Sequence, residues 1–258
     1  MSETNAADER QPANPVTNAN NPPATNDTDL DLARHIQSTL ISNSVTHPQW
    51  QAHIDDCLKN NFHAAMIPPC WVRETAALLR GSGIRTASFI DFPLGTMTTS
   101  GKAFETRRLV EDGVEEIDLM PNVGFLLSGM DREYFADIQS VVKAAEGIPI
   151  KIMLELALLN EAQRERAVQL SINAGVAYLK NASSGAVGRA TPEQIRWLRQ
   201  HAPDPVRIKA SGGIKTVQHV RDLLQAGADL VGTSAGTRIM QELHGNIVHA
   251  DSEPPSRY

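Results

Sequence analysis

The sequence lacks the features of several large protein classes. It has only two cysteines among 258 residues, Cys57 and Cys70, and they lack the CxxC spacing of a redox or metal motif. No stretch approaches the roughly 20 consecutive apolar residues of a membrane helix, and the first residues have neither the basic start nor the apolar core of a signal peptide. We therefore expect reduced thiols in a cytoplasmic protein that has no membrane partner.

Positive charge is also in short supply. The chain has 24 Lys and Arg against 30 Asp and Glu, a formal net charge of -6, so no global field would hold a polyanion. Its eight histidines form no HExxH motif and show no spacing typical of a zinc site. Neither a nucleic-acid partner nor a bound metal is expected.

Large apolar side chains are almost absent from residues 1–28, which carry four prolines and many Asn and Thr. Such a segment cannot bury enough surface to offset the entropy lost on ordering, so we predict a disordered tail. The residues from 29 to 243 show no linker and suffice for one large domain. Residues 244–258 are polar and proline-bearing, and we predict a flexible carboxyl-terminal tail.

Within that domain, short β-rich runs alternate with amphipathic helical patterns. Helices are predicted over 131–146, 161–174, 192–201 and 216–226. Seven strands are predicted over 62–67, 84–90, 114–119, 149–155, 176–180, 206–210 and 229–232. An eighth candidate, 36–41, could be a strand, although its period alone favours a helix that extends through it from Asp29. This repeat implies a parallel sheet with right-handed crossovers, and its length favours a single (β/α)₈ TIM barrel over an open sheet.

Polar residues follow several predicted strands, at the end of a barrel where catalytic groups stand. They include Asp91, Asp118 and Glu155, with Glu155 expected to balance charge, and two lysines that end successive strands, Lys180 and Lys209. One lysine there would be only a solvated cation. Two ammonium groups about 6 Å apart repel by about 3 kcal/mol at an effective dielectric near 20, which lowers one pKa by about 2. A neutral amine in a barrel mouth is a nucleophile that can form a Schiff base with a carbonyl.

Motifs along the chain resemble those of the deoxyribose-phosphate aldolase family, in register from about Leu32 to Met240. They are DFPLG (91–95), EIDLMPNVG (116–124), KIMLEL (151–156), YLK (178–180), ATPE (190–193), KASGGIKT (209–216) and GTSAG (232–236). The resemblance implies a (β/α)₈ class I aldolase that joins acetaldehyde reversibly to glyceraldehyde 3-phosphate, giving 2-deoxyribose 5-phosphate, with no metal or organic cofactor. It also makes 36–41 the first strand.

The resemblance assigns roles by position. Lys180 is the Schiff-base lysine, Lys209 its pKa-lowering neighbour and Asp118 the proton relay. Some family members end in a tyrosine on a tail that assists proton exchange, and Tyr258 ends this chain. Anion-holding positions fall on Gly212, Gly213, Gly232 and Ser234, with Lys215 where the family often has arginine. A Gly-Gly turn before a helix offers N–H donors at a positive dipole end, although it also makes a tight turn without a ligand.

Departures from the family cluster at the substrate end. The first strand lacks the Asp and His of the family's IDHTLL, and the loop after Lys180 carries Ser183 and a glycine displaced by one, Gly185. Residues 66–69 and Ala235 also differ from the usual pattern. The expected partners are a small aldehyde and a sugar phosphate, and a different acceptor aldehyde is the alternative substrate. A homodimer is one assembly that we consider.

Two alternative functions belong to other classes of protein, a serine hydrolase and a non-catalytic binding protein. Residues 232–236 fit GxSxG between a strand and a helix, as in a serine hydrolase. Such an enzyme needs an acid and then a histidine downstream, yet few residues follow Gly236, and His249 precedes Asp251. A non-catalytic barrel that binds a sugar phosphate is the other alternative, and the retention of the two lysines and Asp118 argues against it.

Overall fold

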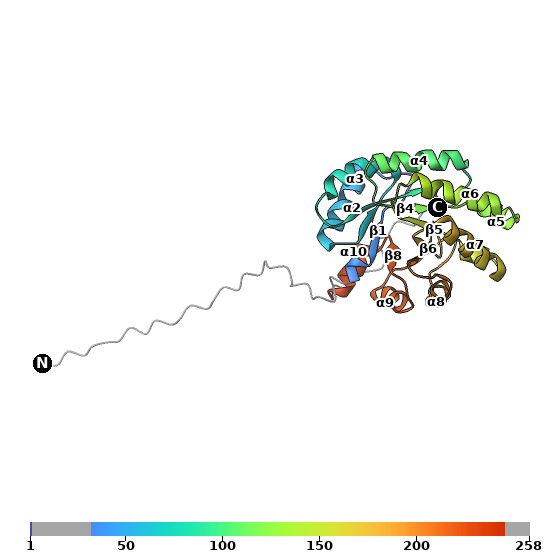
Figure 1. Ribbon diagram of the computed structural model, residues 1–258. Helices are drawn as coiled ribbons and strands as arrows, with labels where there is room; N and C mark the ends of the chain where they lie inside the picture. The colour runs from blue at the N-terminus through green and yellow to red at the C-terminus, as the bar shows by residue number, and fades with distance from the viewer. Residues whose placement is uncertain (2–31, 246–258) are drawn as a thin grey trace.

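The structure is a computed structural model, and it describes Met1 and residues 32–245 (Figure 1). Eight parallel strands close into a barrel in chain order, with β8 pairing with β1. The strands are β1 (Ile36–Thr39), β2 (Ala64–Met66), β3 (Arg85–Ile90), β4 (Glu116–Leu119), β5 (Ile150–Met153), β6 (Tyr178–Lys180), β7 (Arg207–Ser211) and β8 (Leu230–Thr233). The predicted (β/α)₈ barrel is confirmed. Apart from Met1, His244 and Gly245, the tails predicted over 1–28 and 244–258 lie outside the described residues.

Helices surround the barrel, and α4 and α6 lie side by side along one flank (Figure 1). The helices are α2 (His47–Asn60), α3 (Val72–Leu79), α4 (Thr99–Glu111), α5 (Val123–Leu127), α6 (Asp131–Ala144), α7 (Glu161–Ala174), α8 (Pro192–His201), α9 (Val217–Gln225) and α10 (Gly236–Leu243), with 3₁₀ turns η1 (Pro69–Trp71) and η2 (Leu156–Leu158). Among the described residues, no helix combines the length and apolarity needed to cross a bilayer.

The predicted boundaries of the helices agree with the structure more closely than those of the strands. The predictions for α7 and α8 match the observed helices at both ends, and α7 closes on Gly175, whose φ of 94° favours glycine. The strand predicted over 149–155 ends at Met153 in the structure. The prediction ran too far because the loop after the strand begins with another buried apolar residue, Leu154. The ambiguous segment 36–41 contains strand β1, and the helical turn before it covers only residues 32–34.

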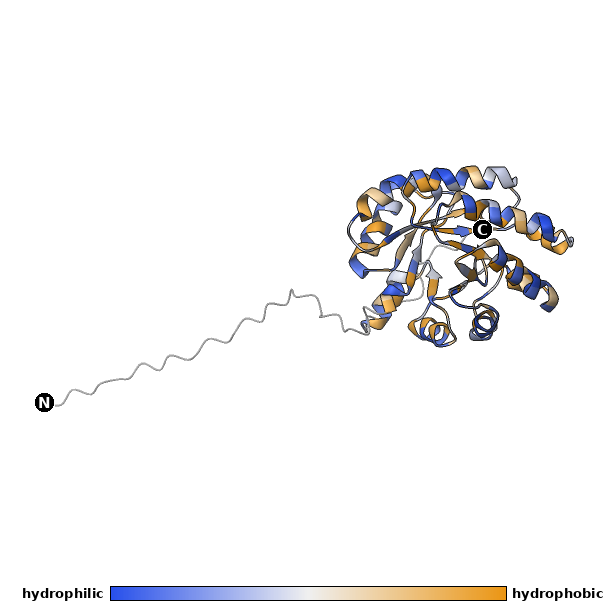
Figure 2. Cartoon of the chain, viewed as in Figure 1, coloured by the Kyte–Doolittle hydropathy of each residue, from blue (hydrophilic) through white to orange (hydrophobic). Residues whose placement is uncertain are grey.

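The apolar core lies between the strands and the helices. Ile54, Ile138, Leu198 and Ile239 are fully buried from the helix side, and the helices carry hydrophilic and hydrophobic residues in alternation along their length (Figure 2). In β4, Ile117 and Leu119 belong to that core, so the alternate residues of the strand face the barrel interior. Barrel interiors are usually filled with branched apolar residues. This one contains charged side chains, and they define the candidate site.

Candidate active site

Two lysines and one carboxylate meet inside the barrel at the carboxyl ends of the strands. Lys180 at the end of β6 pairs in register with Lys209 of β7. The Lys180 Nζ lies 2.8 Å and the Lys209 Nζ 2.7 Å from the same oxygen, Oδ2 of Asp118 on β4. None of the three residues is more than 4% exposed. The structure therefore brings together the three residues that the sequence singled out.

A second layer of polar side chains lies beneath them, and sequence reasoning missed it. Lys151 of β5 lies 2.7 Å from Oε2 of Glu116 and 3.9 Å from Oδ1 of Asp118. Gln37 of β1 donates from Nε2 to the same Glu116 oxygen at 2.9 Å, and its Oε1 accepts a hydrogen bond from Lys209. The available signal was charge at alternate positions of short buried strands, such as Glu116 and Asp118 within EIDL.

Glu116 connects this layer to the amino end of the barrel. Its other oxygen, Oε1, accepts from Arg85 at 2.7 Å and lies 2.8 Å from His63 Nε2. Burial opposes ionisation of Glu116, but Lys151 and His63 outweigh it and hold the pKa of the carboxyl well below its ordinary range. Glu116 therefore remains an anion that helps to balance the lysines.

The cluster shifts the pKa values of Asp118 and Lys209 in the same direction. Burial opposes the charged form of Asp118, yet the ammonium groups of Lys180, Lys209 and Lys151 keep its pKa well below the ordinary value. Burial lowers the pKa of Lys209 to about 7, with Lys180 and Lys151 adding to the effect and Asp118 opposing it. The lowering expected from paired lysines thus falls on Lys209, where desolvation is the largest cause.

Glu155 supports the loop that follows Lys180. It stands just beyond β5, is 1% exposed and has a left-handed backbone, with φ of 52°. Its Oε1 accepts from the backbone N–H of Ser183 at 2.6 Å, while Oε2 has no hydrogen-bond partner among the described residues. Burial raises its pKa. Glu155 is thus mainly an anchor for the Ser183 loop, and it is more than the counter-charge that the sequence suggested.

Asn181 fixes the start of the same loop to the next strand. Its Oδ1 accepts from Ser211 N at 2.8 Å, and its Nδ2 donates to Ser211 O at 3.0 Å. These two hydrogen bonds imitate the pairing of two backbone strands between the ends of β6 and β7. Lys180, one residue earlier, is thereby held at a fixed height in the barrel.

The Gly-Gly turn after β7 lies directly against the loop after β6. Gly212 has φ of 107°, and a Cβ there would stand 2.1 Å from Gly188 O. Gly213 has φ of 66°, and its N–H nitrogen is 3.0 Å from the position of a Cβ on Gly185. Both the backbone conformation and this close approach require glycine. The displaced Gly185 of the sequence is therefore in contact with the predicted anion-binding turn.

The remaining predicted anion-binding residues are distributed around this end. Gly232 of β8 faces the lysine cluster, because a Cβ there would lie 2.8 Å from Lys209 Cε. Ser234 and Lys215 are exposed in the loops after β8 and β7. The buried hydroxyl of Thr233 joins those two loops by donating to Ile214 O at 2.7 Å. Gly232 thus makes room for a lysine, a role that the sequence did not suggest. Tyr258 lies outside the described residues.

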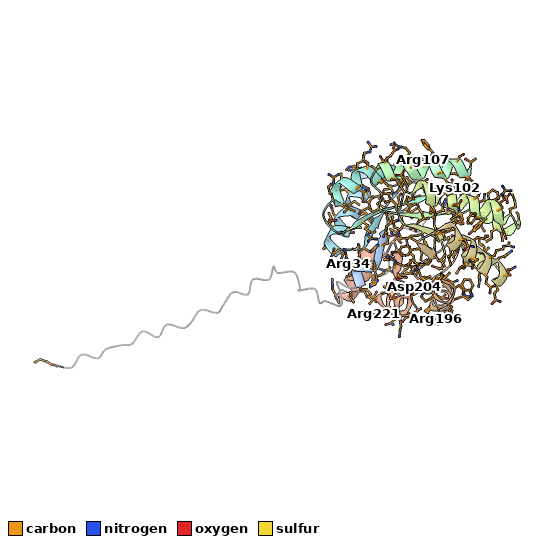
Figure 3. All side chains as sticks on the ribbon, in the orientation of Figure 1. Arg34, Lys102, Arg107, Arg196, Asp204 and Arg221 are labelled. Atoms are coloured by element: carbon orange, nitrogen blue, oxygen red, sulfur yellow. The ribbon has the colours of Figure 1, made fainter. Side chains whose placement is uncertain are left out.

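A separate buried ion cluster holds the DFPLG loop. Lys102 of α4 is fully buried between α4 and α6 (Figure 3) and lies 2.6 Å from Asp137 Oδ2 and 3.4 Å from Asp91 Oδ2. It also donates to the carbonyls of Gly95 at 3.1 Å and Met120 at 3.2 Å. Asp91, one of the polar residues noted at strand ends, therefore joins a structural cluster that is distinct from Lys180.

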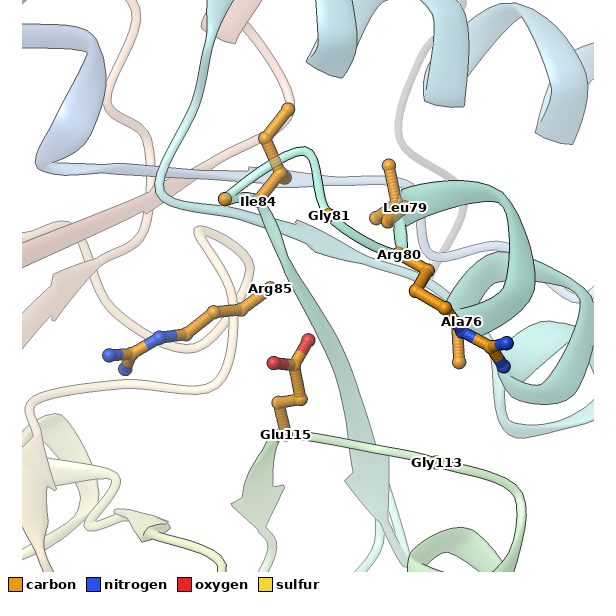
Figure 4. A pocket seen from close by; sticks show the side chains of 9 residues that line it. Ala76, Leu79, Arg80, Gly81, Ile84, Arg85, Gly113 and Glu115 are labelled. Carbon is orange, nitrogen blue, oxygen red and sulfur yellow. The ribbon is translucent and has the colours of Figure 1, made fainter.

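A pocket of about 700 Å³ opens at the amino ends of β3 and β4, the opposite end of the barrel from Lys180 (Figure 4). Its lining includes Arg80, Arg85 and Glu115. In Figure 4 the side chains of Arg80 and Arg85 point away from each other. The chemistry of the molecule is concentrated at the lysine cluster.

A closed (β/α)₈ barrel with two lysines on one buried carboxylate at its strand ends is the arrangement of an aldolase, a lyase. No protein-family model matches the chain. A deoxyribose-phosphate aldolase of Geobacillus sp. is 35% identical over 212 residues, which cover 82% of this chain and 95% of that protein. One of Staphylococcus haemolyticus is 34% identical over 217 residues, covering 84% and 99%. The tetrameric deoxyribose phosphate aldolase of Aeropyrum pernix superposes with a TM-score of 0.76 at 27% identity, covering 84% and 92%. The chain belongs to the deoxyribose-phosphate aldolase family.

Proposed function

We propose that the protein cleaves 2-deoxy-D-ribose 5-phosphate reversibly to acetaldehyde and D-glyceraldehyde 3-phosphate through a Schiff base on Lys180. One observation carries the proposal: Lys180 and Lys209 both lie within hydrogen-bond distance of one oxygen of Asp118. The shared carboxylate holds two amines in a site that is almost closed to water. The names of the relatives support the substrate.

The reaction balances with groups of the chain alone, and it uses no metal or organic cofactor. The Lys180 amine adds to the C1 aldehyde of the open-chain sugar, and the carbinolamine loses water to form a protonated imine. A base takes the proton from the C3 hydroxyl, the C2–C3 bond breaks, and its electron pair moves toward the iminium nitrogen. Glyceraldehyde 3-phosphate leaves, C2 of the enamine takes a proton, and water releases acetaldehyde and the Lys180 amine.

Proton transfer in these steps falls to Lys209 and Asp118 in our proposal. A pKa of about 7 lets Lys209 give and take a proton near neutral pH, which is the range in which acid–base catalysis is most efficient. Asp118 has a strongly lowered pKa, so it stays ionised and orients both amines as their shared hydrogen-bond acceptor. Its part as a proton relay stays a prediction. A part for Tyr258 at the enamine carbon stays a prediction, which deuterium exchange into acetaldehyde by Tyr258→Phe would test.

Phosphate binding is proposed at Gly212, Gly213, Ser234 and Lys215. The two glycines form a turn in close contact with the loop after β6, and phosphate sites in such barrels form in the loops after the last two strands. The altered loop with Ser183 lines the same region, which favours weak or altered phosphate recognition. Lys215→Ala should raise KM for a phosphorylated acceptor and leave KM for a plain aldehyde unchanged in steady-state kinetics.

The proposed setting is the cytoplasm, in keeping with the two free thiols of Cys57 and Cys70. A homodimer remains part of the proposal. Light scattering of the purified protein would test it, because a monomeric mass at micromolar concentration would contradict it.

The test of the proposed function is a coupled assay of acetaldehyde release from 2-deoxyribose 5-phosphate. The parent protein should be active, Lys180→Met should lose turnover below detection, and the exposed Lys59→Met should match the parent. Release of acetaldehyde by Lys180→Met at the parent rate would refute the assignment. Activity only on other aldehyde acceptors, with Lys180 still required, would replace the substrate and retain the mechanism.

A further inference from the structure

The charges buried inside the barrel do not balance. Three lysines, Lys151, Lys180 and Lys209, are at most 4% exposed and face two carboxylates, Glu116 and Asp118, that are at most 1% exposed. At the amino end of the barrel, Arg85 adds positive charge to this cluster through Glu116, which the imidazole of His63 also contacts. With all three lysines protonated, the interior therefore carries an excess of positive charge, and that excess is costly in a low-dielectric site.

Gln37 stands where a further carboxylate would complete the balance. It is fully buried on β1, accepts from Lys209 through Oε1 and donates to Glu116 Oε2 at 2.9 Å through Nε2. The two bonds fix the orientation of the amide, since only the oxygen accepts and only the nitrogen donates. Gln37 thus satisfies both charged neighbours by hydrogen bonding and adds no charge of its own.

We propose that Gln37 is a positioning residue of the aldolase site, whose uncharged amide bridges Lys209 and Glu116 and holds Lys209 in place without setting a second carboxylate beside it. This inference rests on the proposed function for its catalytic meaning. Its physical content, the charge state of Lys209, does not depend on which aldehyde is the substrate.

The surroundings of Lys209 support this inference on every side. β4 contributes Asp118, the anion that Lys209 contacts directly among the described residues. β6 contributes Lys180 and β5 contributes Lys151, both cations. β8 presents Gly232, which has no side chain, and β1 presents Gln37. Among the residues that the structure describes, one anion and two cations therefore face Lys209, in agreement with its pKa of about 7.

The nearest further acid does not alter this balance. Glu155 lies close enough to interact with Lys180, but burial raises its pKa, so it is less readily ionised than an ordinary carboxyl. A carboxylate in hydrogen-bond contact typically changes a neighbouring pKa by roughly 1 to 3. Gln37→Glu would place such a group directly on Lys209.

The experiment follows the charge of Lys209 by NMR of protein labelled with ¹³C at the lysine side chains, with the Lys209 signal assigned from its loss in Lys209→Met. In the parent, the signal should titrate near pH 7. In Gln37→Glu the midpoint should rise by roughly 1 to 3 pH units. Gln37→Met removes the hydrogen bond without adding charge, so its midpoint should not rise. Turnover of Gln37→Glu at pH 7 should fall at least tenfold and recover as the pH is raised.

The outcomes separate the two proposals. A Lys209 signal that stays charged up to pH 9 in the parent would overturn the inference without any variant, as would an unmoved midpoint in folded Gln37→Glu. A shifted midpoint in a protein that never forms an imine would leave the role of Gln37 in Lys209 charge intact and refute the proposed function. An equal rise in Gln37→Met would show that packing, and not charge, controls Lys209.

Discussion

Lys209→Met should change how the stability of the protein depends on pH. In the folded protein the pKa of Lys209 is lowered from 10.5 to about 7, chiefly by burial. Between these two values the unfolded chain binds the proton more tightly than the folded chain, so the free energy of unfolding rises with pH. Below pH 7 both states carry the charge and the folded state bears the full cost of burying it. Replacement by methionine removes this titration and retains an apolar chain of similar length.

The magnitude follows from the two pKa values. Their difference corresponds to about 5 kcal/mol at about 1.4 kcal/mol per pKa unit, all of it present below pH 7. Between pH 7 and pH 9, Lys209 should regain about 2 kcal/mol of unfolding free energy. Cys57 acts in the opposite direction above about pH 8.5, because burial raises its pKa to about 12. The difference between parent and variant therefore isolates Lys209.

The assay is urea unfolding followed by circular dichroism at pH 6, 7, 8 and 9, for the parent, Lys209→Met and the exposed Lys59→Met. The unfolding free energy of the parent relative to Lys209→Met should increase by about 2 kcal/mol from pH 7 to pH 9. Lys59→Met should run parallel to the parent. Parallel curves for the parent and Lys209→Met would refute the lowered pKa and, with it, the argument for a proton carrier.

Three further predictions concern the site and its supports. Asp118→Asn should keep the parent's circular dichroism spectrum and lower turnover at least a hundredfold in the acetaldehyde assay, because it removes the negative charge and the base that the two lysines share; near-parent turnover would move proton transfer elsewhere. Lys102→Met should lower the unfolding free energy by about 3–5 kcal/mol in urea titrations, since it leaves Asp137 buried without its cation; an unchanged midpoint would contradict this. Gly212→Ala should raise KM for the phosphorylated substrate, because its Cβ would stand 2.1 Å from Gly188 O; an unchanged KM would place the phosphate elsewhere.

Sequence periodicity predicts the barrel because each element has its own local signal. The helices begin at capping residues such as Asn160 and end at residues such as Gly175, so α7 is predicted to the residue. The ends of strands are harder to predict. A loop such as Leu154–Glu155 is as deeply buried as the strand before it, so its residues resemble those of a strand. For segment 36–41 the period alone favours a helix, and the family resemblance, not the period, predicts strand β1 there.

The meeting of Asp118, Lys180 and Lys209 could be predicted because all three fall near the carboxyl ends of predicted strands, although Lys209 lies two residues before the end of β7. The supporting layer could not be predicted. Gln37 and Glu116 lie far apart in the sequence, and only the closure of the barrel brings them into contact. The sequence also indicated that one lysine of the pair would have a lowered pKa. The family resemblance assigns that lowered pKa to Lys180, with Lys209 as the neighbour that causes it, whereas in the structure burial lowers the pKa of Lys209.

Borohydride trapping is the most direct test of whether Lys180 forms the Schiff base. The protein is incubated with acetaldehyde, reduced with sodium borohydride and digested, and the peptides are analysed by mass spectrometry. We expect one ethyl adduct, on the peptide that contains Lys180, with no adduct in Lys180→Met. An adduct on Lys209 in the parent, or an undiminished adduct in Lys180→Met, would contradict the account.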